Sequence, residues 1–155
     1  MNDPADPVDG AVRASRALVG IAVRSLAQAL EVMTLPQYRV LVLVSTRGAM
    51  RSGDLALELG VHASTLTRTV DRLVGGGWVQ RTGNPANRRE VLVEATPAGR
   101  ELVQQVMAHR RREVALALER LDPAARETVT DGLALFASVV EDPGAGELSR
   151  LGVER

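Results

Sequence analysis

The sequence predicts a mainly α-helical fold with one small β-hairpin, and three observations support this prediction. Hydrophobic residues make up 45% of the chain but aromatic residues only 2%, so Leu, Val and Ala must build the core, a composition that favours helices. Two short helical patterns are separated by Gly60, and two strand patterns follow the three glycines at residues 75–77. This order is typical of a winged helix-turn-helix, flanked here by longer N- and C-terminal helices.

The N-terminal segment is expected to form a disordered leader over residues 1–7 and one long helix over residues 8–32. In that helix an apolar residue recurs every four positions, at Leu18, Ala22, Leu26 and Leu30, which gives the helix a single apolar stripe. Thr34 can cap a second helix, and Pro36 suits its first turn. The second helix is expected to end near residue 45 and to bury most of its apolar side chains.

The central unit is assigned to residues 34–96. Two shorter helices are expected within it, at residues 52–59 and 63–74. Gly60 can adopt the left-handed backbone conformation that a tight turn between them needs, and Ala56 is small enough to let the two helices cross closely. The pattern therefore predicts a helix-turn-helix.

A hairpin is expected after the second of these helices. Its strands are predicted at residues 78–82 and 90–95, with Asn84 and Pro85 in the turn. Thr96 and Pro97 then begin a long helix that runs to about residue 121.

The C-terminal dimerisation helices are assigned to residues 97–141, and residues 142–155 to a tail. Asp122 and Pro123 begin the last helix in the same way, as a cap followed by proline. The long helices outside the central unit carry apolar faces that the central unit cannot cover, and the simplest cover is the same face of a second subunit. We therefore expect a homodimer.

Composition and motifs exclude several classes of protein. The 155-residue chain has a net charge of zero and no Cys, which excludes disulfides and thiolate chemistry. The acidic, proline-containing start is not a secretory signal, and no apolar run reaches the roughly 18–20 residues that span a bilayer. A cytoplasmic protein without membrane contact is expected. No catalytic pair, cofactor fingerprint or metal-ligand spacing is present, so an enzyme, a cofactor and a metal site are not expected.

The second helix of the helix-turn-helix is the candidate DNA-reading element. Its first turns carry small and hydroxyl-bearing residues that allow close approach to base edges, and its arginines can contact guanine or phosphate. The candidate DNA-binding residues of this helix are Ser64, Thr65, Thr67, Arg68 and Arg72. The alternative is that Ser64 and Thr65 only cap the helix and that Arg68 is solvated.

Local charge favours the DNA-binding interpretation. Between His62 and Arg89 there are five Arg residues and one acid, Asp71, in a chain that is neutral overall. A basic hairpin can place an arginine in the minor groove of double-stranded DNA. Arg81, Arg88 and Arg89 are therefore candidate DNA-binding residues of the hairpin, and we expect Asp71 to pair with an arginine and orient it.

In combination, these motifs resemble those of the MarR family of bacterial transcription regulators, over about residues 8–141. The residues that carry the resemblance are Leu35-x-Gln37-Tyr38-x-Val40-Leu41, Leu55-Ala56, Leu59-Gly60-Val61, Ser64-Thr65-Leu66-Thr67-Arg68, Asp71-Arg72-Leu73, Gly77-Trp78-Val79-x-Arg81, Asn87-Arg88-Arg89 and Thr96-Pro97-x-Gly99. The resemblance implies a dimer held by its terminal helices, with two winged units that read a palindromic operator. Arg88 and Arg89 would be the wing arginines, one in the minor groove and one bracing the loop.

The wing departs from the family pattern at two positions. Asn84 and Asn87 stand where the family usually has acids. An acid would brace a wing arginine through an ion pair, whereas Asn87 offers a neutral hydrogen bond that is generally weaker by about half. We therefore expect a looser wing tip with more net positive charge.

The long C-terminal helix carries a polar run that interrupts its apolar face. Arg110 falls on the face defined by Val103, Val106, Met107 and Val114. One interpretation is that Arg110 pairs with Glu113 on the same helix and is solvated. The other is that His109 or Arg110 binds an acidic ligand or fixes the dimer register.

Many members of the family bind small phenolic or carboxylate effectors, and we expect Tyr38, His109 and Arg110 to form such a site here. The sequence thus predicts a repressor that binds DNA as a homodimer and is released by a small effector. The alternative function is a winged-helix protein-interaction module that does not bind DNA.

Overall fold

The computed structural model describes residues 6–140, except for the side chains of Arg88 and Arg89. Most of the expected leader and the whole expected tail, residues 142–155, lie outside this part of the chain. The described helices are α1 (Pro7–Val32), α2 (Leu35–Arg47), α3 (Ser52–Leu59), α4 (Ala63–Gly75), α5 (Pro97–Glu119) and α6 (Pro123–Val139). The strands are β1 (Met50–Arg51), β2 (Val79–Asn84) and β3 (Asn87–Ala95).

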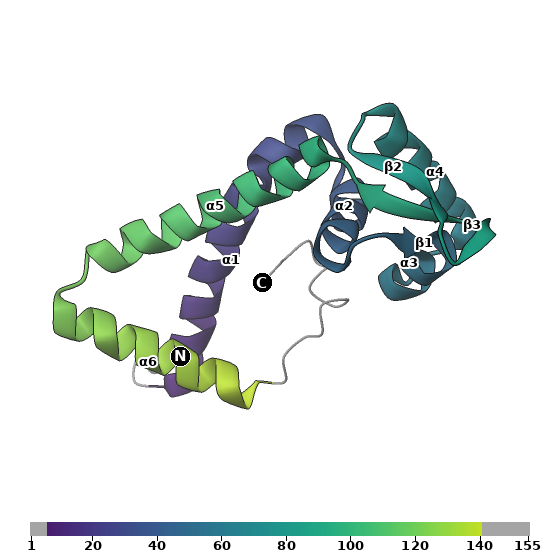
Figure 1. Cartoon of the computed structure of the whole chain (residues 1–155). Helices are drawn as coiled ribbons and strands as arrows, with labels where there is room; N and C mark the ends of the chain where they lie inside the picture. The colour runs from purple at the N-terminus through teal and green to yellow at the C-terminus, as the bar shows by residue number, and fades with distance from the viewer. Residues whose placement is uncertain (1–5, 141–155) are drawn as a thin grey trace.

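Figure 1 shows a compact winged unit at one end of the molecule and an open frame of helices at the other. The winged unit consists of α2, α3, α4 and the three strands. Helices α1 and α5 leave it side by side, and α6 turns back at the far end of α5. This arrangement confirms the predicted fold class, a mainly helical winged helix-turn-helix with flanking helices.

Helices α1, α5 and α6 each begin directly after a residue whose side chain caps the helix. The Thr96 hydroxyl accepts a hydrogen bond from the Gly99 N–H (3.1 Å), and the Asp122 carboxylate accepts one from the Ala125 N–H (2.9 Å). Asp6 caps α1 by accepting from the Val8 N–H (2.8 Å), so the first helix begins at Pro7, a residue that we had assigned to the leader. Each cap satisfies an N–H group that would otherwise lack a partner.

The three strands form an antiparallel sheet in the order β1-β3-β2. Strand β1 was not predicted, because two residues are too few to show an alternating pattern. Both hairpin strands reach further toward the turn than expected, with Val79 opposite Ala95 at the base and Asn84 opposite Asn87 at the tip. A register irregularity between Gly83 and Asn84 lies just before the turn.

The hydrophobic core lies in the winged unit and extends into the adjoining turns of the long helices. Helix α2 contributes Tyr38 and the apolar residues after it, which are all buried as expected. Helix α1 adds Leu26 and Ala29, but Leu18 and Leu30 of its apolar stripe remain 44% exposed. Among the described residues no single helix is long and apolar enough to cross a membrane; only α1 and α2 together pass that test, as a pair bent by 102°.

Candidate nucleic-acid interface

The turn between α3 and α4 has the conformation that its sequence predicts. Gly60 adopts a left-handed backbone (φ 64°, ψ 37°) and ends α3, a conformation that costs least at glycine. The N–H of Val61 donates to the carbonyl of Ala56 (3.0 Å), and Ala56 is itself buried. The chain can therefore start α4 directly after the turn, with α4 packed on α3.

Helix α4 has one buried and one exposed side. Leu66, Val70 and Leu73 face the core. The residues predicted to contact DNA are exposed on the other side; they are Ser64, Thr65, Thr67, Arg68 and Arg72. A helix that presents short polar side chains and arginines in this way can enter the major groove.

The start of α4 contradicts the alternative in which Ser64 and Thr65 merely cap the helix. His62 occupies the capping position, and its carbonyl accepts from the N–H groups of Thr65 and Leu66 (both 3.0 Å). The imidazole makes no capping hydrogen bond. Ser64 and Thr65 therefore lie inside the first turn, with their side chains exposed.

Three side chains of α4, those of Thr67, Arg68 and Thr69, bond back to the helix itself. The Thr67 hydroxyl donates to the carbonyl of Ala63 (2.9 Å), and Arg68 Nε donates to the carbonyl of Ser64 (3.4 Å). With its hydrogen engaged, the Thr67 hydroxyl offers acceptor lone pairs and a methyl group to the exterior. Such a side chain suits a base amino group or a thymine methyl group.

The predicted partnership of Asp71 is present, and the arginine is Arg81. Arg81 Nη2 donates to Asp71 Oδ1 at 2.6 Å, which ties strand β2 to helix α4. Arg81 keeps other guanidinium donors for a phosphate, because only one of its nitrogens bonds to Asp71 in this contact. The pair lies close to the surface, where its net stabilisation is small and its orienting effect is the larger consequence.

An acid outside the hairpin tip braces the wing. Glu90 Oε2 accepts from Asn84 Nδ2 (2.7 Å) and from Arg51 Nε (2.9 Å), so one carboxylate joins all three strands. Asn84 Oδ1 in turn accepts from the Ala86 N–H (3.0 Å), an arrangement that shapes the turn. Sequence reasoning missed Arg51 and Glu90, since their meeting depends on strand β1.

The expected wing arginines can be placed only by their backbone. Arg88 and Arg89 belong to β3, and their side chains lie outside the described part of the structure. The position of these two residues in the strand next to the turn is consistent with the sequence, and their roles on DNA stay predictions.

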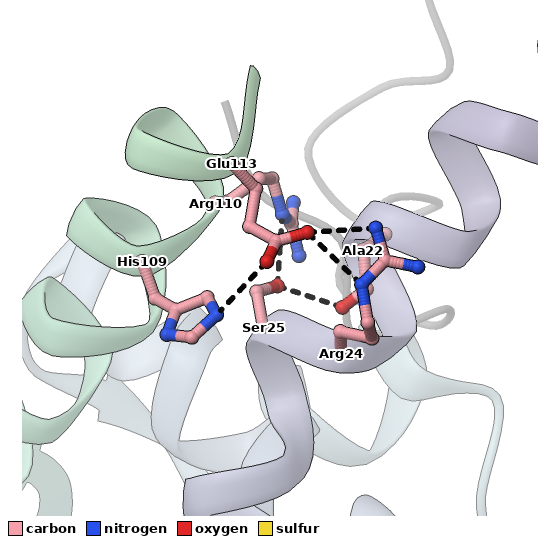
Figure 2. Close-up of polar contacts among 6 residues, drawn as sticks. All are labelled: Ala22, Arg24, Ser25, His109, Arg110 and Glu113. Atoms are coloured by element: carbon pink, nitrogen blue, oxygen red, sulfur yellow. Dashed lines mark hydrogen bonds and ion pairs between the residues drawn. The ribbon is translucent and has the colours of Figure 1, made fainter. Parts of the chain in front are cut away.

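A polar cluster joins the two long helices, and its pairing differs from the one we expected (Figure 2). Glu113 pairs with Arg24 of α1 through Nε (2.9 Å) and Nη2 (2.7 Å), and not with Arg110. His109 Nε2 lies 3.8 Å from the other Glu113 oxygen. The hydrogen bonds from Arg24 lower the pKa of Glu113, further helped by the charges of Arg24 and His109.

Arg110 points to a different partner. Its Nε donates to the Ser25 hydroxyl (3.3 Å), and that hydroxyl donates to the carbonyl of Ala22 (2.7 Å). Within the part of the chain that the structure describes, the buried Nη2 of Arg110 has no hydrogen-bond partner. The interpretation in which Arg110 is solvated and pairs with Glu113 is therefore wrong, since Arg110 bonds to Ser25 and Glu113 bonds to Arg24.

A groove of about 650 Å³ runs beside Arg110 on α5. Its lining residues are Met107, Ala108, Arg110, Arg111, Val114, Ala115 and Leu118. His109 faces Glu113 instead, and Tyr38 is only 1% exposed within the core. Of the three residues expected to bind an effector, Arg110 lines this groove, and Tyr38 and His109 do not. Residues 6–140 contain no group of three or more metal-ligating side chains.

Comparisons with known proteins agree with this geometry. Residues 33–91 match the model of the MarR family. A segment of 110 residues is 28% identical to an uncharacterised HTH-type transcriptional regulator, YfiV of Bacillus subtilis, and covers 71% of this chain and 69% of that protein. Over 73 residues the chain is 37% identical to the multiple antibiotic resistance protein MarR of Salmonella typhimurium; this match covers 47% of the chain and about half, 51%, of that protein.

One solved structure extends the likeness over nearly the whole chain. The crystal structure of RV1404 from Mycobacterium tuberculosis has a TM-score of 0.77 and 39% sequence identity, with 92% of this chain and 98% of that chain covered. The long helices are therefore shared along with the winged unit.

Proposed function

Because this chain belongs to the MarR family of HTH transcriptional regulators, we propose that it is a repressor that binds a palindromic operator as a homodimer and is released by a small effector. The observation that carries the DNA-binding part is the exposed face of α4, where five short polar or basic side chains lie opposite a fully buried apolar stripe.

Two groups of residues divide the contacts with DNA. Ser64, Thr65, Thr67 and Arg68 read base edges in the major groove. Arg72, Arg81, Arg88 and Arg89 contact phosphates and the minor groove beside the wing. The N-terminus of α4 adds partial positive charge toward the phosphates.

A direct test compares DNA binding by Arg68→Ala and Arg88→Ala, with Arg112→Ala on the distant helix α5 as the control. DNA selected by the wild-type protein from a random library serves as the probe. Arg68→Ala is expected to cost about 1–3 kcal/mol at one base position and to relax its preference. Arg88→Ala should weaken binding to all sequences and reduce the salt dependence.

The outcome separates DNA binding from the rival function. A dimer that makes about 6–10 phosphate contacts gives a log–log salt slope of several units. A wild-type protein that selects no DNA would favour a protein-interaction module, and two variants with unchanged affinity would refute the residue assignment.

The homodimer is supported by apolar side chains that the described chain leaves largely exposed. Helix α6 contains no buried residue, although Leu135 is 68% exposed and Phe136 is 57% exposed. The N-terminal half of α1 also exposes Val8, Val12 and Val19. Apolar helix faces of this extent are typical of an interface.

The effector is proposed to be anionic or phenolic and to bind in the groove beside Arg110. A buried guanidinium nitrogen without a partner favours an acidic group, and the apolar lining of the groove suits an aromatic ring. Benzoate and 4-hydroxybenzoate are suitable probes in a thermal-shift assay. The shift should be lost in Arg110→Ala and kept in Arg112→Ala; equal shifts in both variants would rule out this site.

A further inference from the structure

The long helix α5 joins the winged unit at a junction that is built around one carbonyl group, that of Trp78. Trp78 stands between α4 and strand β2, directly before Val79, and Thr96 stands between strand β3 and α5 as the N-cap of α5. The Thr96 N–H donates to the Trp78 carbonyl (3.0 Å), and the single hydrogen of the Thr96 hydroxyl is shared between the carbonyls of Gly77 (2.7 Å) and Trp78 (3.1 Å). The start of α5 is thereby tied to the residue directly before the hairpin.

The same junction includes the end of the reading helix. The N–H of Trp78 donates to the carbonyl of Leu73 (2.9 Å), and the N–H of Gly77 donates to that of Val74 (3.0 Å). The shorter hydrogen bond of the Thr96 hydroxyl, to the Gly77 carbonyl (2.7 Å), ties α5 to this segment as well. Helix α4, the wing and α5 therefore meet within one short network of hydrogen bonds.

Gly99 lets the first turn of α5 lie against the backbone of Trp78. A Cβ atom at Gly99 would lie 2.2 Å from the Trp78 oxygen and 2.8 Å from Cδ1 of Leu41 in α2. The first of these atoms belongs to the backbone and cannot rotate away. The two segments would have to separate by about 0.8 Å before that contact reached 3.0 Å.

We propose that Gly99 and Thr96 are positioning residues that set the angle between α5 and the reading helix α4, and through it the half-site spacing that the dimer accepts on DNA. About 30 Å of α5 lies beyond Gly99, given a rise of 1.5 Å per residue. A small tilt at the junction therefore becomes a displacement of several ångströms at the far end of α5. The spacing part of this inference rests on the proposed function; the angle does not.

The angle can be measured in the full chain without DNA. The sequence has no Cys, so spin labels on Leu57→Cys in α3 and Glu119→Cys at the end of α5 report one distance between the winged unit and α5. Dilution with unlabelled protein removes distances between subunits. Gly99→Ala is expected to shift or broaden this distance by several ångströms.

Gly75→Ala is the matched control, because a Cβ at this glycine, which lies at the end of α4 near the junction, would meet nothing within 4 Å. Its distance distribution should coincide with that of the parent. An unchanged distribution in Gly99→Ala would overturn the proposal. If circular dichroism shows that Gly99→Ala does not fold, Thr96→Val replaces it, since valine keeps the side-chain volume and loses the hydroxyl.

Thr96→Ser is the conservative counterpart of Thr96→Val and should keep the parent distance. The DNA probes are the sequence selected by the wild-type protein and versions of it with the half-sites moved apart or together by one and two base pairs. On the probe with the native spacing, Thr96→Val should lose about 3- to 10-fold in affinity. Its affinity for a single half-site should not change. Equal losses on single and paired half-sites would overturn the positioning role.

The two proposals fail in different ways. A wild-type protein that selects no DNA refutes the proposed function, and the spin-label distances still decide whether Gly99 and Thr96 set the angle. If the variants bind DNA with the same spacing preference as the wild type, only the role of Gly99 and Thr96 in half-site spacing is refuted.

Discussion

The Arg24–Glu113 pair connects α1 to α5 and makes their packing depend on pH. Because Arg24 lowers the pKa of Glu113 below its ordinary value of 4.5, the folded chain binds this proton less readily than the unfolded chain does. The stabilisation is therefore fully present above pH 4.5 and is lost as the pH falls through the lowered pKa.

Glu113→Gln should remove this contribution. We expect the variant to melt below wild type at pH 7, and the difference in Tm to shrink as the pH falls below 4. Thermal unfolding between pH 3 and 7 measures it, with Glu119→Gln, an exposed change on the same helix, as the control. A Tm difference that stays constant across this range would contradict the linkage.

At the scale of residues, the sequence predicted an ion pair correctly inside the winged unit. It predicted the wrong partner for an ion pair that joins the two long helices. Asp71 was expected to pair with an arginine, and Arg81 fulfils this within the winged unit. Glu113 was expected to pair with Arg110, three positions away. Its partner is Arg24, 89 residues away in sequence, because helical spacing defines a face of α5 but does not say which side chain of another helix packs on it.

At the scale of elements, the wing shows why an amide stands where the family usually has an acid. Asn84 donates to Glu90, which also accepts from Arg51. An aspartate at residue 84 would place a carboxylate next to the Glu90 carboxylate, and the two like charges would repel. The loose wing tip that we expected from the missing acids is thus opposed by a brace that includes strand β1.

We predict that Asn84→Asp lowers the Tm by about 2–4 °C, which corresponds to roughly 1 kcal/mol in a chain of this size. The second-site change Glu90→Gln should restore most of the loss, since the glutamine amide can donate to the new aspartate. A double-mutant cycle in thermal unfolding measures the coupling. Independent, additive effects of the two changes would mean that the brace does not exist in solution.

Helix starts were predictable where a cap and a proline give a local signal; α6 begins at Pro123, directly after the Asp122 cap, as expected from the sequence. Strand β1 was not predictable, and with it the Arg51–Glu90 contact remained hidden. Tyr38 illustrates the same limit for the candidate effector site. Its burial was predicted, but its separation from the groove beside Arg110 depends on how α2 and α5 pack.

At the scale of the whole molecule, α6 packs too little against the described chain to be stable alone. It has no buried residue, and its apolar side chains contrast with a polar face formed by Glu127, Asp131 and Ser138. Short isolated helices are marginal in water. The ordered helix is therefore consistent with a partner subunit that covers its apolar face, as the proposed homodimer requires.

Phe136→Glu tests this cover directly. Burial of one large apolar side chain contributes about 1.5–3 kcal/mol, and a symmetric dimer buries two copies, so the dissociation constant of the dimer should rise by at least about 100-fold. Sedimentation or light scattering over a range of concentrations measures the change. Ala134→Glu introduces the same charge on the polar face of α6 and should leave the mass unchanged. Because each winged unit would then bind its half-site alone, Phe136→Glu should also lose the preference for paired half-sites while keeping the affinity for a single half-site. If Phe136→Glu dimerises as tightly as Ala134→Glu, the interface lies elsewhere on the molecule.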